Sequence, residues 1–306
     1  DPKELHDEFG DKVAFCGGVD TQELLVNGTA EEVQAKVKEL RTIFPTGLII
    51  SPSHEAILPD IAFSLKTKIE ERKLSEEDIL GIGVGVPAPV TAEGIVNGSA
   101  NLGWKYKEVK KEMEELTGLK AYIGNDANVA ALGEMWKGGG AGEKNMIMVT
   151  LGTGVGGGVI IDGKMLVGNN GAGGEIGHIC VNYEENDRCG CGNKGCLEQY
   201  ASATGIVRLA EQKLKTEKRE TILNKAAITA KDVFDAVKAG DEVADEIAAE
   251  FGKYLGYGLA NLAAVVNPAV FVIGGGVSKA GEVLIPYIEK PYKERAFFAD
   301  KNVRFV

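Results

Sequence analysis

The sequence predicts an α/β fold divided into two domains. Short apolar runs with strand character alternate along the chain with segments in which apolar residues recur at helical spacing, a pattern typical of α/β layers. The chain has 306 residues, and a single hydrophobic core usually stops growing at about that length. Apolar residues make up 44% of the sequence and charged residues 26%, which is typical of globular domains. The composition therefore predicts a globular protein rather than a disordered one.

The charge balance and the cysteines predict a cytoplasmic protein that binds neither nucleic acid nor membranes. The 45 acidic residues outnumber the 34 basic ones, and a net charge of -11 repels phosphate backbones and anionic lipids. The most basic stretch, residues 213–219, is interrupted by Thr216 and Glu217, so we expect a solvated helix face. We find no signal peptide and no apolar run of membrane-spanning length. Four of the five cysteines lie together, unlike those of disulfide-stabilised secreted domains.

Residues 1–61 predict one βαβ unit. Apolar runs at 13–16 and 47–50 are typical of buried strands. Between them, Thr29 and Glu32 form a capping box, in which two polar side chains satisfy backbone N–H groups at a helix start. Apolar residues then recur at helical spacing, so a helix joins the two strands.

The rest of the chain alternates strands and helices, and proline and glycine mark two of the ends. Pro87 stops a Gly-rich apolar strand because proline lacks a backbone N–H, and Gly118 ends an amphipathic helix. Strands are predicted at residues 79–86, 121–124, 145–151, 155–161, 269–273 and 302–306. Helices are predicted at residues 57–73, 109–117, 126–136 and 241–266.

The strongest chemical signal is HICVNYEENDRCGCGNKGC, which runs from His178 to Cys196. Zinc prefers thiolate and imidazole ligands, and the glycines near Cys189, Cys191 and Cys196 allow one tight turn to direct three sulfurs at a common centre. Either His178 or Cys180 would be the fourth ligand, since both would face the same side of a strand. Four protein ligands leave no open position, so the predicted zinc is structural. The alternative interpretation is a set of free or redox-active thiols.

Two glycine-rich segments follow predicted strands and are candidates for nucleotide binding. Gly152, Thr153 and Gly154 lie in LGTGVGGG, where glycines would let backbone N–H groups surround phosphate oxygens and the threonine hydroxyl would add a donor. This segment does not match the Walker pattern GxxxxGK[ST], and a glycine turn without a ligand is the alternative. A second run, Gly274 to Gly276, would either admit the adenosine of a nucleotide or form a tight turn.

Four polar residues are candidates for catalysis and for binding a polyhydroxylated ligand. Asp126 in GNDANVAALGE lies between a strand end and a helix start, where the helix dipole favours an ionised carboxylate that accepts a proton from a substrate hydroxyl. The alternative role for Asp126 is that of a helix N-cap. Asn101 in NLGW, Glu175 in GGEIGH and Glu198 in GCLEQY lie near turns or metal ligands, where side chains can converge on such a ligand.

Seven segments occur in a fixed order: GVGVPAPV, NLGW, NDANVAALGE, LGTGVGGGVI, GAGGEIGHI, CGCGNKGCLEQYAS and VFVIGGGVS. In sequence and order they resemble the ROK group of sugar kinases, and within it the bacterial glucokinases, over residues 62–306. The resemblance implies a two-domain ribonuclease H-like fold, the fold of actin-like ATPases. It also implies a homodimeric enzyme that transfers the γ-phosphoryl group of ATP, bound with Mg²⁺, in line to a hexose. Glucose, converted to glucose 6-phosphate, is the favoured substrate.

The resemblance also implies a role for each candidate residue. Asp126 is the base that activates the sugar hydroxyl. The residues that hold the sugar are Asn101, Asn125, Glu175, His178 and Glu198. The nucleotide is held by the phosphate-binding turn Gly152, Thr153 and Gly154 and by Gly274 and Gly275 at the adenosine. The structural Zn²⁺ is held by His178, Cys189, Cys191 and Cys196, which favours His178 over Cys180.

The chain departs from the family pattern at its start. Family members open with a DxGGT segment that holds the ATP phosphates and metal, and the nearest string here, GGVDTQELL from Gly17, has a different order. Impaired catalysis is therefore expected. We also do not find the family's closing helix, which would follow Val306.

Two strings in residues 9–61, FGDKVAFCGGVDTQELLVNGTAEEV and GLIISPSHEAILPDI, resemble the C-terminal end of the uroporphyrinogen decarboxylase family and related methyltransferases. They match the last two strands of that TIM barrel and the helix between them. His54 would face the substrate in a complete barrel, and we expect it in a surface loop here. The predicted organisation is a fusion: a βαβ fragment of a TIM barrel over 1–61, the remainder of the small ROK domain over 62–124, and the large ROK domain with the zinc knuckle over 125–306.

Two other functions compete with the sugar kinase. A non-catalytic sugar-sensing regulator uses the same scaffold, but such proteins carry a basic helix-turn-helix segment, which we do not find. The hypothesis of a decarboxylase or corrinoid methyltransferase is supported only by the resemblance to part of a barrel. The sequence therefore favours an ATP-dependent sugar kinase, either active or disabled by the fusion.

Overall fold

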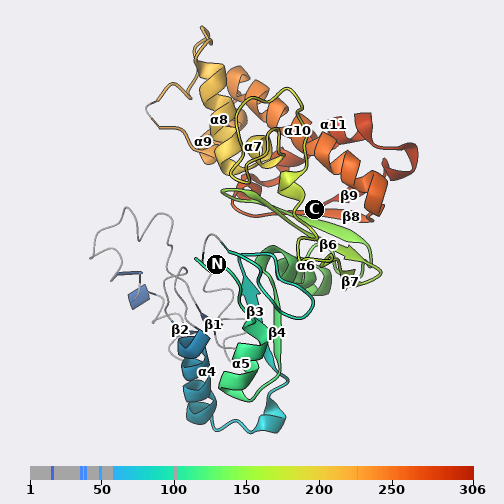
Figure 1. Ribbon diagram of the computed structural model, residues 1–306. Helices are drawn as coiled ribbons and strands as arrows, with labels where there is room; N and C mark the ends of the chain where they lie inside the picture. Colours follow the sequence, from blue (N-terminus) through green and yellow to red (C-terminus); the bar gives the residue numbers. More distant parts are fainter. Residues whose placement is uncertain are drawn as a thin grey trace. The chain divides into compact units, whose positions relative to one another are not determined.

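The described strands form two parallel pairs in one unit and a five-stranded sheet in the other (Figure 1). The computed structural model describes residues 58–99, 102–225 and 227–306, with a few short segments before residue 58. The chain divides into two compact units, Asp1–Asn125 and Asp126–Val306. The cysteine-rich segment and both glycine-rich segments therefore fall in the second unit.

Two short strands are described before residue 58. β1 (Phe15–Cys16) and β2 (Leu48–Ile49) pair in parallel. They lie at the predicted strands 13–16 and 47–50, so these two strands are confirmed. Most of residues 1–57, including His54, lie outside the described residues.

The rest of the first unit packs two helices against a parallel pair of strands. Its elements are α4 (Leu58–Arg72), η1 (Glu76–Asp78), β3 (Ile82–Val86), α5 (Val109–Thr117) and β4 (Ala121–Asn125). β3 and β4 pair in register from Ile82 opposite Ala121 to Val86 opposite Asn125. Leu58 of α4 and Met113 of α5 are buried in the same core as Ile82 and Ala121.

Two predicted boundaries in this unit can be compared with the structure: the end of the helix 109–117 and the start of the strand 79–86. α5 ends at the predicted place, because Gly118 adopts the left-handed conformation with φ 77° and its N–H donates to the carbonyl of Glu114 at 2.8 Å. The prediction placed the start of the strand at residue 79, which is too early. The strand starts at Ile82, since Leu80 is 94% exposed and cannot belong to a buried strand.

The second unit is built on a five-stranded sheet in the order β7-β6-β5-β8-β9. Its strands are β5 (Met146–Leu151), β6 (Val155–Ile161), β7 (Lys164–Met165), β8 (Val270–Gly274) and β9 (Arg304–Phe305). β5 pairs antiparallel with β6 and parallel with β8. The strands predicted at 145–151, 155–161, 269–273 and 302–306 are confirmed.

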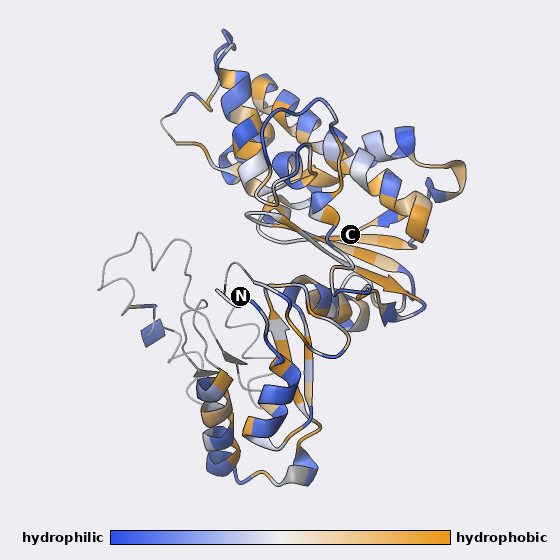
Figure 2. Ribbon diagram, in the orientation of Figure 1, coloured by the Kyte–Doolittle hydropathy of each residue, from blue (hydrophilic) through white to orange (hydrophobic). Residues whose placement is uncertain are grey.

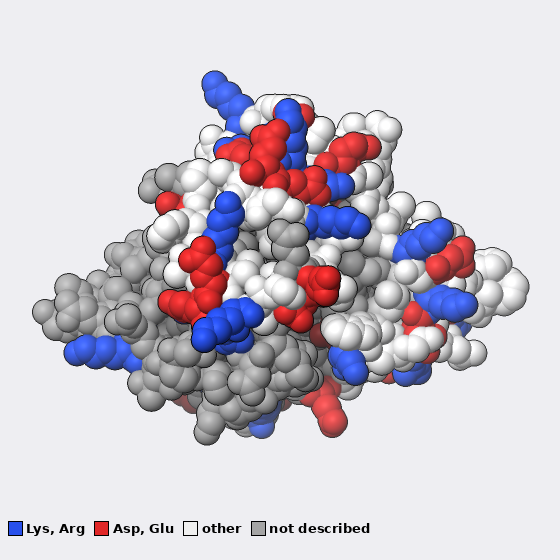
Figure 3. All heavy atoms as spheres, turned by 90° about the horizontal axis from the view of Figure 1, so that it is seen from below, with Lys and Arg blue, Asp and Glu red and all other residues white. Residues whose placement is uncertain are grey.

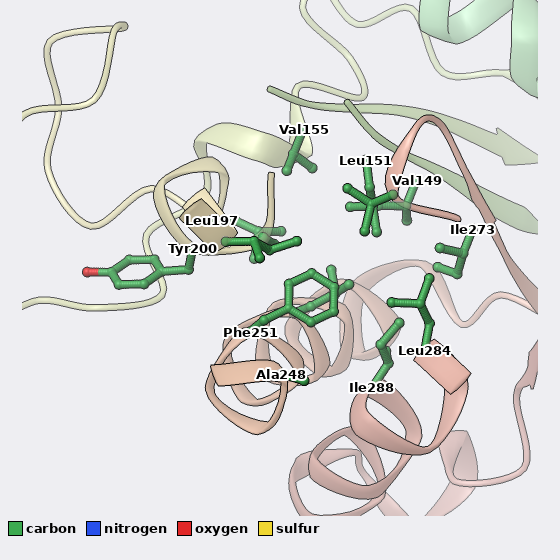
Figure 4. Packing of buried hydrophobic residues seen from close by; sticks show 14 of the residues in the cluster. Val149, Leu151, Val155, Leu197, Tyr200, Ala248, Phe251, Ile273, Leu284 and Ile288 are labelled. Carbon is green, nitrogen blue, oxygen red and sulfur yellow. The ribbon is translucent and has the colours of Figure 1, made fainter. Parts of the chain in front are cut away.

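Helices cover both faces of this sheet. Ala131 of α6 (Asp126–Lys137) packs with Met146 and Met148 on one face, while Ile147 and Val149 join the core on the other. Figure 4 shows Val149 in this second core with Phe251 and Ile288. That second core includes α10 (Glu242–Val266) and α11 (Leu284–Arg295). The remaining elements are η2 (Ile176–His178), α7 (Glu198–Ala201), α8 (Ala203–Leu214), α9 (Ala230–Lys238), η3 (Val277–Val283) and η4 (Phe298–Asp300). The strands are mostly apolar, whereas the helices carry both hydrophilic and hydrophobic residues (Figure 2).

The long helix α10 has the ends that its sequence predicts. The carboxylate of Asp241 accepts from the backbone N–H groups of Val243 and Ala244, and Asn267 closes the helix in the left-handed conformation with φ 49°. Gly256 brings α10 close to α11, since a Cβ there would lie 2.7 Å from the carbonyl oxygen of Ile288. The predicted helix 241–266 is confirmed.

The most basic stretch of the chain pairs with acidic side chains. Arg219 contacts Glu217 at 2.7 Å and Glu246 at 2.8 Å, and Lys213 contacts the same two carboxylates. On the face drawn in Figure 3, Lys and Arg side chains likewise lie among Asp and Glu side chains. Across the described ranges, none of the helices combines the length and the apolar character needed to cross a membrane.

Glycines in β6 allow a helix and a loop to lie directly against the two faces of this strand. A Cβ at Gly158 would lie 2.3 Å from the Cβ of Ala131 in α6. A Cβ at Gly157, on the opposite face, would lie 2.8 Å from the carbonyl oxygen of Gly174. Real Cβ atoms do not approach that closely, so side chains at these positions would push both neighbours away from the strand.

Gly158→Ala is expected to lower the free energy of unfolding by about 1–3 kcal/mol, because α6 must move to admit the methyl group. The matched control is Gly133→Ala, which places the same methyl group in α6 itself. A Cβ at Gly133 would meet nothing within 4 Å, and alanine there should stabilise the helix by about 0.5–1 kcal/mol. Urea unfolding followed by circular dichroism measures both effects. Equal unfolding free energies for the two variants would contradict this account of β6.

Candidate active site

Three cysteines and one histidine converge in the second unit. His178 ends η2, Cys189 and Cys191 lie in the loop that follows, and Cys196 precedes α7. One ligand atom from each of these four side chains lies within 4.8 Å of the other three. Gly192, at φ 92°, lets the chain turn back, so that the N–H of Cys189 donates to the carbonyl of Asn193 at 2.8 Å. The cluster has the size and the ligand types of a tetrahedral metal site.

The structure separates the two candidates for the fourth ligand. The Nδ1 atom of His178 lies 3.8 Å from the Sγ atom of Cys189. Cys180 lies outside the cluster, and its sulfur faces Gly195. The reason is that His178 belongs to a 3-10 turn rather than to a strand, so the expectation that both residues face the same side does not hold.

The carboxylate of Glu198 joins this cluster to the glycine-rich turn. Its Oε1 atom lies 3.5 Å from the Sγ atom of Cys189, and its Oε2 atom accepts from the backbone N–H of Val155 at 3.0 Å. A Cβ at Gly154 would lie 2.1 Å from Oε2, so only glycine leaves room for this bond. Glu198 is therefore held from both sides at the start of β6.

The two glycine-rich segments meet at one edge of the sheet. Because β5 and β8 are parallel neighbours, their carboxyl ends lead into adjacent turns, residues 152–154 and 275–276. Gly275 has φ 88°, and a Cβ there would lie 2.6 Å from the carbonyl oxygen of Leu151. The first turn is tied to the start of α8, since Ala203 donates to the carbonyl of Gly152 and Thr204 to that of Thr153, each at 2.8 Å.

Asp126 and Glu175 belong to elements that contact the same strand. Asp126 is exposed in the first turn of α6, and its Oδ1 atom accepts from the N–H of Ala127 at 2.8 Å. The Cβ of Ala127 lies 3.3 Å from where a Cβ at Gly156 would be. Glu175 precedes η2 and makes no capping hydrogen bond with its side chain. The elements that carry Asp126, Glu175, His178 and Glu198 therefore all border the first residues of β6.

Two predicted sugar-binding residues are not placed with this group. Asn101 lies outside the described residues. Asn125 ends β4 in the first unit, where its Nδ2 atom donates to the carbonyl of Ala88 at 3.3 Å.

A pocket of about 320 Å³ lies beside the second glycine-rich turn. Gly276, Val277 and Ala280 form one side, and Phe234 of α9 lies on another. The sequence reasoning named the glycines but missed the α9 side of the pocket. A capping box at Thr229 and Asp232 marks the start of α9 and would have located that helix.

A buried carboxylate lies in the segment that leads to Cys189. The side chain of Glu185 is 8% exposed and accepts from the Asp187 N–H at 2.9 Å, from Nη2 of Arg208 at 2.5 Å and from the Tyr200 hydroxyl. Burial opposes its charge, but these donors outweigh burial and lower the pKa of Glu185 to about 2. Burial, followed by the Glu185 carboxylate, raises the pKa of Tyr200 to about 12. The pair is thus a carboxylate and a neutral phenol near neutral pH.

Comparison with known proteins places the chain in a family. A model of the ROK family matches residues 50–305. The chain belongs to the ROK family. The chain is 45% identical over 246 residues to the glucokinase of Halalkalibacterium halodurans, a match that covers 78% of this chain and 74% of that enzyme. The predicted resemblance to ROK sugar kinases is confirmed.

Solved ROK structures share the fold. A ROK glucokinase from Streptomyces griseus, in complex with glucose and AMPPNP, matches with a TM-score of 0.65 and 32% identity over 81% of this chain and 82% of that chain. The predicted α/β fold of actin-like ATPases is thereby confirmed. The xylose repressor of Caldicellulosiruptor bescii, also similar, is 32% identical over 82% of this chain but only 63% of the repressor.

The low pKa of Glu185 determines how this side chain makes the stability of the ROK chain depend on pH. Its pKa is lower in the folded than in the unfolded chain, so the ionised carboxylate stabilises the fold above about pH 4.5, and this stabilisation is lost as the pH falls towards about 2. Glu185→Gln should therefore lower the free energy of unfolding more at about pH 6 than at about pH 3.5. Urea unfolding in the presence of a chelator measures the difference.

The matched control is Glu211→Gln, an exposed position on α8. This control should change the unfolding free energy little at either pH. An equal effect of Glu185→Gln at both pH values would show that the carboxylate is not stabilised by the fold.

Proposed function

We propose that this chain is an ATP-dependent sugar kinase that converts glucose to glucose 6-phosphate. The observation that carries the proposal is the gathering of the elements bearing Asp126, Glu175, His178 and Glu198 around the start of β6. Carboxylates and an imidazole at one place suit a polyhydroxylated substrate. The similarity to glucokinases supports glucose as that substrate.

In this proposal Asp126 is the base. Its exposed carboxylate accepts the proton of the sugar hydroxyl that attacks the γ-phosphorus. Asn101, Asn125, Glu175, His178 and Glu198 hold the remaining hydroxyls and so orient the attacking oxygen. Positioning supplies much of the rate in such reactions, because the two reacting groups are held in line.

The nucleotide is assigned to the glycine-rich edge of the sheet. Backbone N–H groups of Gly152, Thr153 and Gly154 bind phosphate oxygens, and Gly274 and Gly275 face the adenosine. The neighbouring pocket of about 320 Å³, with its apolar wall from Val277 and Phe234, suits a purine base. Mg²⁺ enters with ATP and neutralises phosphate charge.

The Cys/His cluster is assigned to a structural Zn²⁺. His178, Cys189, Cys191 and Cys196 supply one imidazole nitrogen and three sulfurs, the ligand set that zinc prefers, within the observed 4.8 Å. Four protein ligands leave no position for substrate. The role of the ion is therefore to hold the loop beside Glu198.

The start of the chain is assigned to a fusion. Residues 9–61 are taken as a βαβ segment related to uroporphyrinogen decarboxylases, followed by ROK segments over 62–124 and 125–306. The ROK family model begins at residue 50, so the two assignments overlap over residues 50–61. The parallel pairing of β1 with β2 supports this assignment. Without a DxGGT segment, we expect turnover to be slow while sugar binding persists. A homodimer in the cytoplasm is the expected state of the protein.

Asp126→Asn should lower kcat by about a hundredfold or more, because the attacking hydroxyl loses its base, while glucose binding persists. A coupled assay for ADP release with a panel of hexoses measures turnover, and calorimetry measures glucose binding. Asp60→Asn is the matched control, since Asp60 is also an exposed aspartate in the first turn of a helix, α4. Glucose binding by the unaltered chain without any ADP release would instead indicate a sugar-sensing regulator.

Cys191→Ser should reduce bound zinc to well below one ion per chain, because one of four ligands is lost. Cys180→Ser should leave the zinc content unchanged, since Cys180 lies outside the cluster. Elemental analysis of both purified variants gives the stoichiometry. Loss of zinc in Cys180→Ser together with full retention in Cys191→Ser would overturn the assigned ligand set.

A further inference from the structure

The segment 182–188, which leads to Cys189, has no regular secondary structure, yet side chains hold it at several points. Glu185 is its most buried anchor, with donors from Tyr200 at the end of α7 and from Arg208 in α8. Nη2 of Arg208 also lies 3.2 Å from the carboxylate of Asp187. The loop is therefore fixed to two helices through one carboxylate and its neighbour.

Other contacts extend this attachment to both ends of the metal-binding loop. Nδ2 of Asn182 donates to the hydroxyl of Tyr200 at 2.9 Å. Gln199 donates from Nε2 to the carbonyl of Asp187 at 3.0 Å, and its Oε1 accepts from the backbone N–H of Cys196 at 3.1 Å. The approach to Cys189 and the backbone of Cys196 are thus tied to the same short helix, α7.

Tyr200 itself is firmly held. Its ring stacks on that of Tyr254 in α10 at 3.9 Å between centroids, and the guanidinium of Arg208 lies 5.4 Å from its centre. In Figure 4 the ring extends away from Leu197 and Phe251, with its hydroxyl oxygen farthest from that apolar cluster. The hydroxyl is therefore aimed at the loop by a packed ring, which is what a positioning group requires.

We propose that Tyr200 and Arg208 are positioning residues that hold the segment 182–188 so that Cys189 and Cys191 meet Cys196 and His178 before a metal binds. The proposal rests on the metal site proposed above. An unsupported loop would have to lose its conformational freedom when the metal binds, and that loss would weaken the affinity. Groups that orient ligands in this way commonly change metal affinity by about 10–100-fold when they are removed.

The chain offers matched controls for both residues. Tyr287 also donates its hydroxyl to a carboxylate, that of Asp245, but it lies in α11 and makes no contact with the loop in the described structure. Arg219, which is itself exposed, also pairs with carboxylates, those of Glu217, Glu246 and Glu242. Substitution of Tyr287 or Arg219 therefore removes the same kind of interaction as substitution of Tyr200 or Arg208, but away from the loop.

The experiment measures the zinc affinity of the full chain by competition with a chromophoric chelator. Tyr200→Phe and Arg208→Met should bind zinc about tenfold or more weakly than the unaltered chain, whereas Tyr287→Phe and Arg219→Met should bind it with unchanged affinity. Arg208→Lys should recover part of the loss, because it keeps the charge but not the planar fork. Circular dichroism of the metal-free variants checks the fold, and the absorption spectrum with Co²⁺ reports the ligand set.

If Tyr200→Phe and Arg208→Met bind zinc as tightly as the controls Tyr287→Phe and Arg219→Met, the positioning role is overturned while the metal site remains intact. A loss of equal size in Tyr200→Phe and Tyr287→Phe would also overturn it, since the effect would then be one of general stability. Failure of the unaltered chain to bind zinc would overturn the metal site and this inference together. None of these readouts depends on kinase activity.

Discussion

Strand β6 has glycines where neighbouring elements lie against both of its faces, and this close contact determines where the proposed site residues lie. α6 approaches the strand at Gly158, while Gly174 approaches it at Gly157 from the other side. The helix begins with Asp126, and the loop continues into Glu175 and His178. Since a Cβ at either glycine would lie within 3 Å of these neighbours, both elements pack directly against one strand. In phosphoryl transfer, misplacement of reacting groups by about 1 Å costs much of the rate.

Glu198 and the cysteine-rich loop complete the arrangement from a less regular part of the chain. The loop between Cys180 and Cys196 has no helix or long strand, so its shape depends on its turns, on the side chains that attach it to α7 and α8 and, in the proposed function, on the zinc ion. Cys196 and Glu198 are two residues apart, and Glu198 also contacts Cys189. A metal that orders the cysteines therefore also orders a carboxylate proposed to bind the sugar, which explains how a closed metal site could influence a neighbouring reaction.

Elements with local signals were predicted from the sequence, whereas contacts between distant residues were not. The end of α5 follows from Gly118, and the spacing of the three cysteines predicted that their sulfurs come together, whereas the spacing alone left His178 and Cys180 open as the fourth member of the cluster. By contrast, Glu185 and Arg208 are 23 residues apart, and no pattern in the sequence pairs them. The α9 wall of the pocket beside the second glycine-rich turn was missed for the same reason, since a pocket is formed by segments that meet only after folding.

The second unit separates most of the sugar side of the proposed site from the phosphate side. Glu175 and His178 lie beside β6, while the turn 152–154 depends on β5 and α8. Glu198 borders both sides, because its carboxylate accepts from the N–H of Val155 and lies against Gly154. A defect in phosphate binding, such as that expected without DxGGT, is therefore expected to leave Glu175 and His178 in place. The same separation gives a physical reason why the relatives include both a glucokinase and a xylose repressor. A scaffold that holds a sugar independently of a nucleotide can lose phosphoryl transfer and still respond to the sugar.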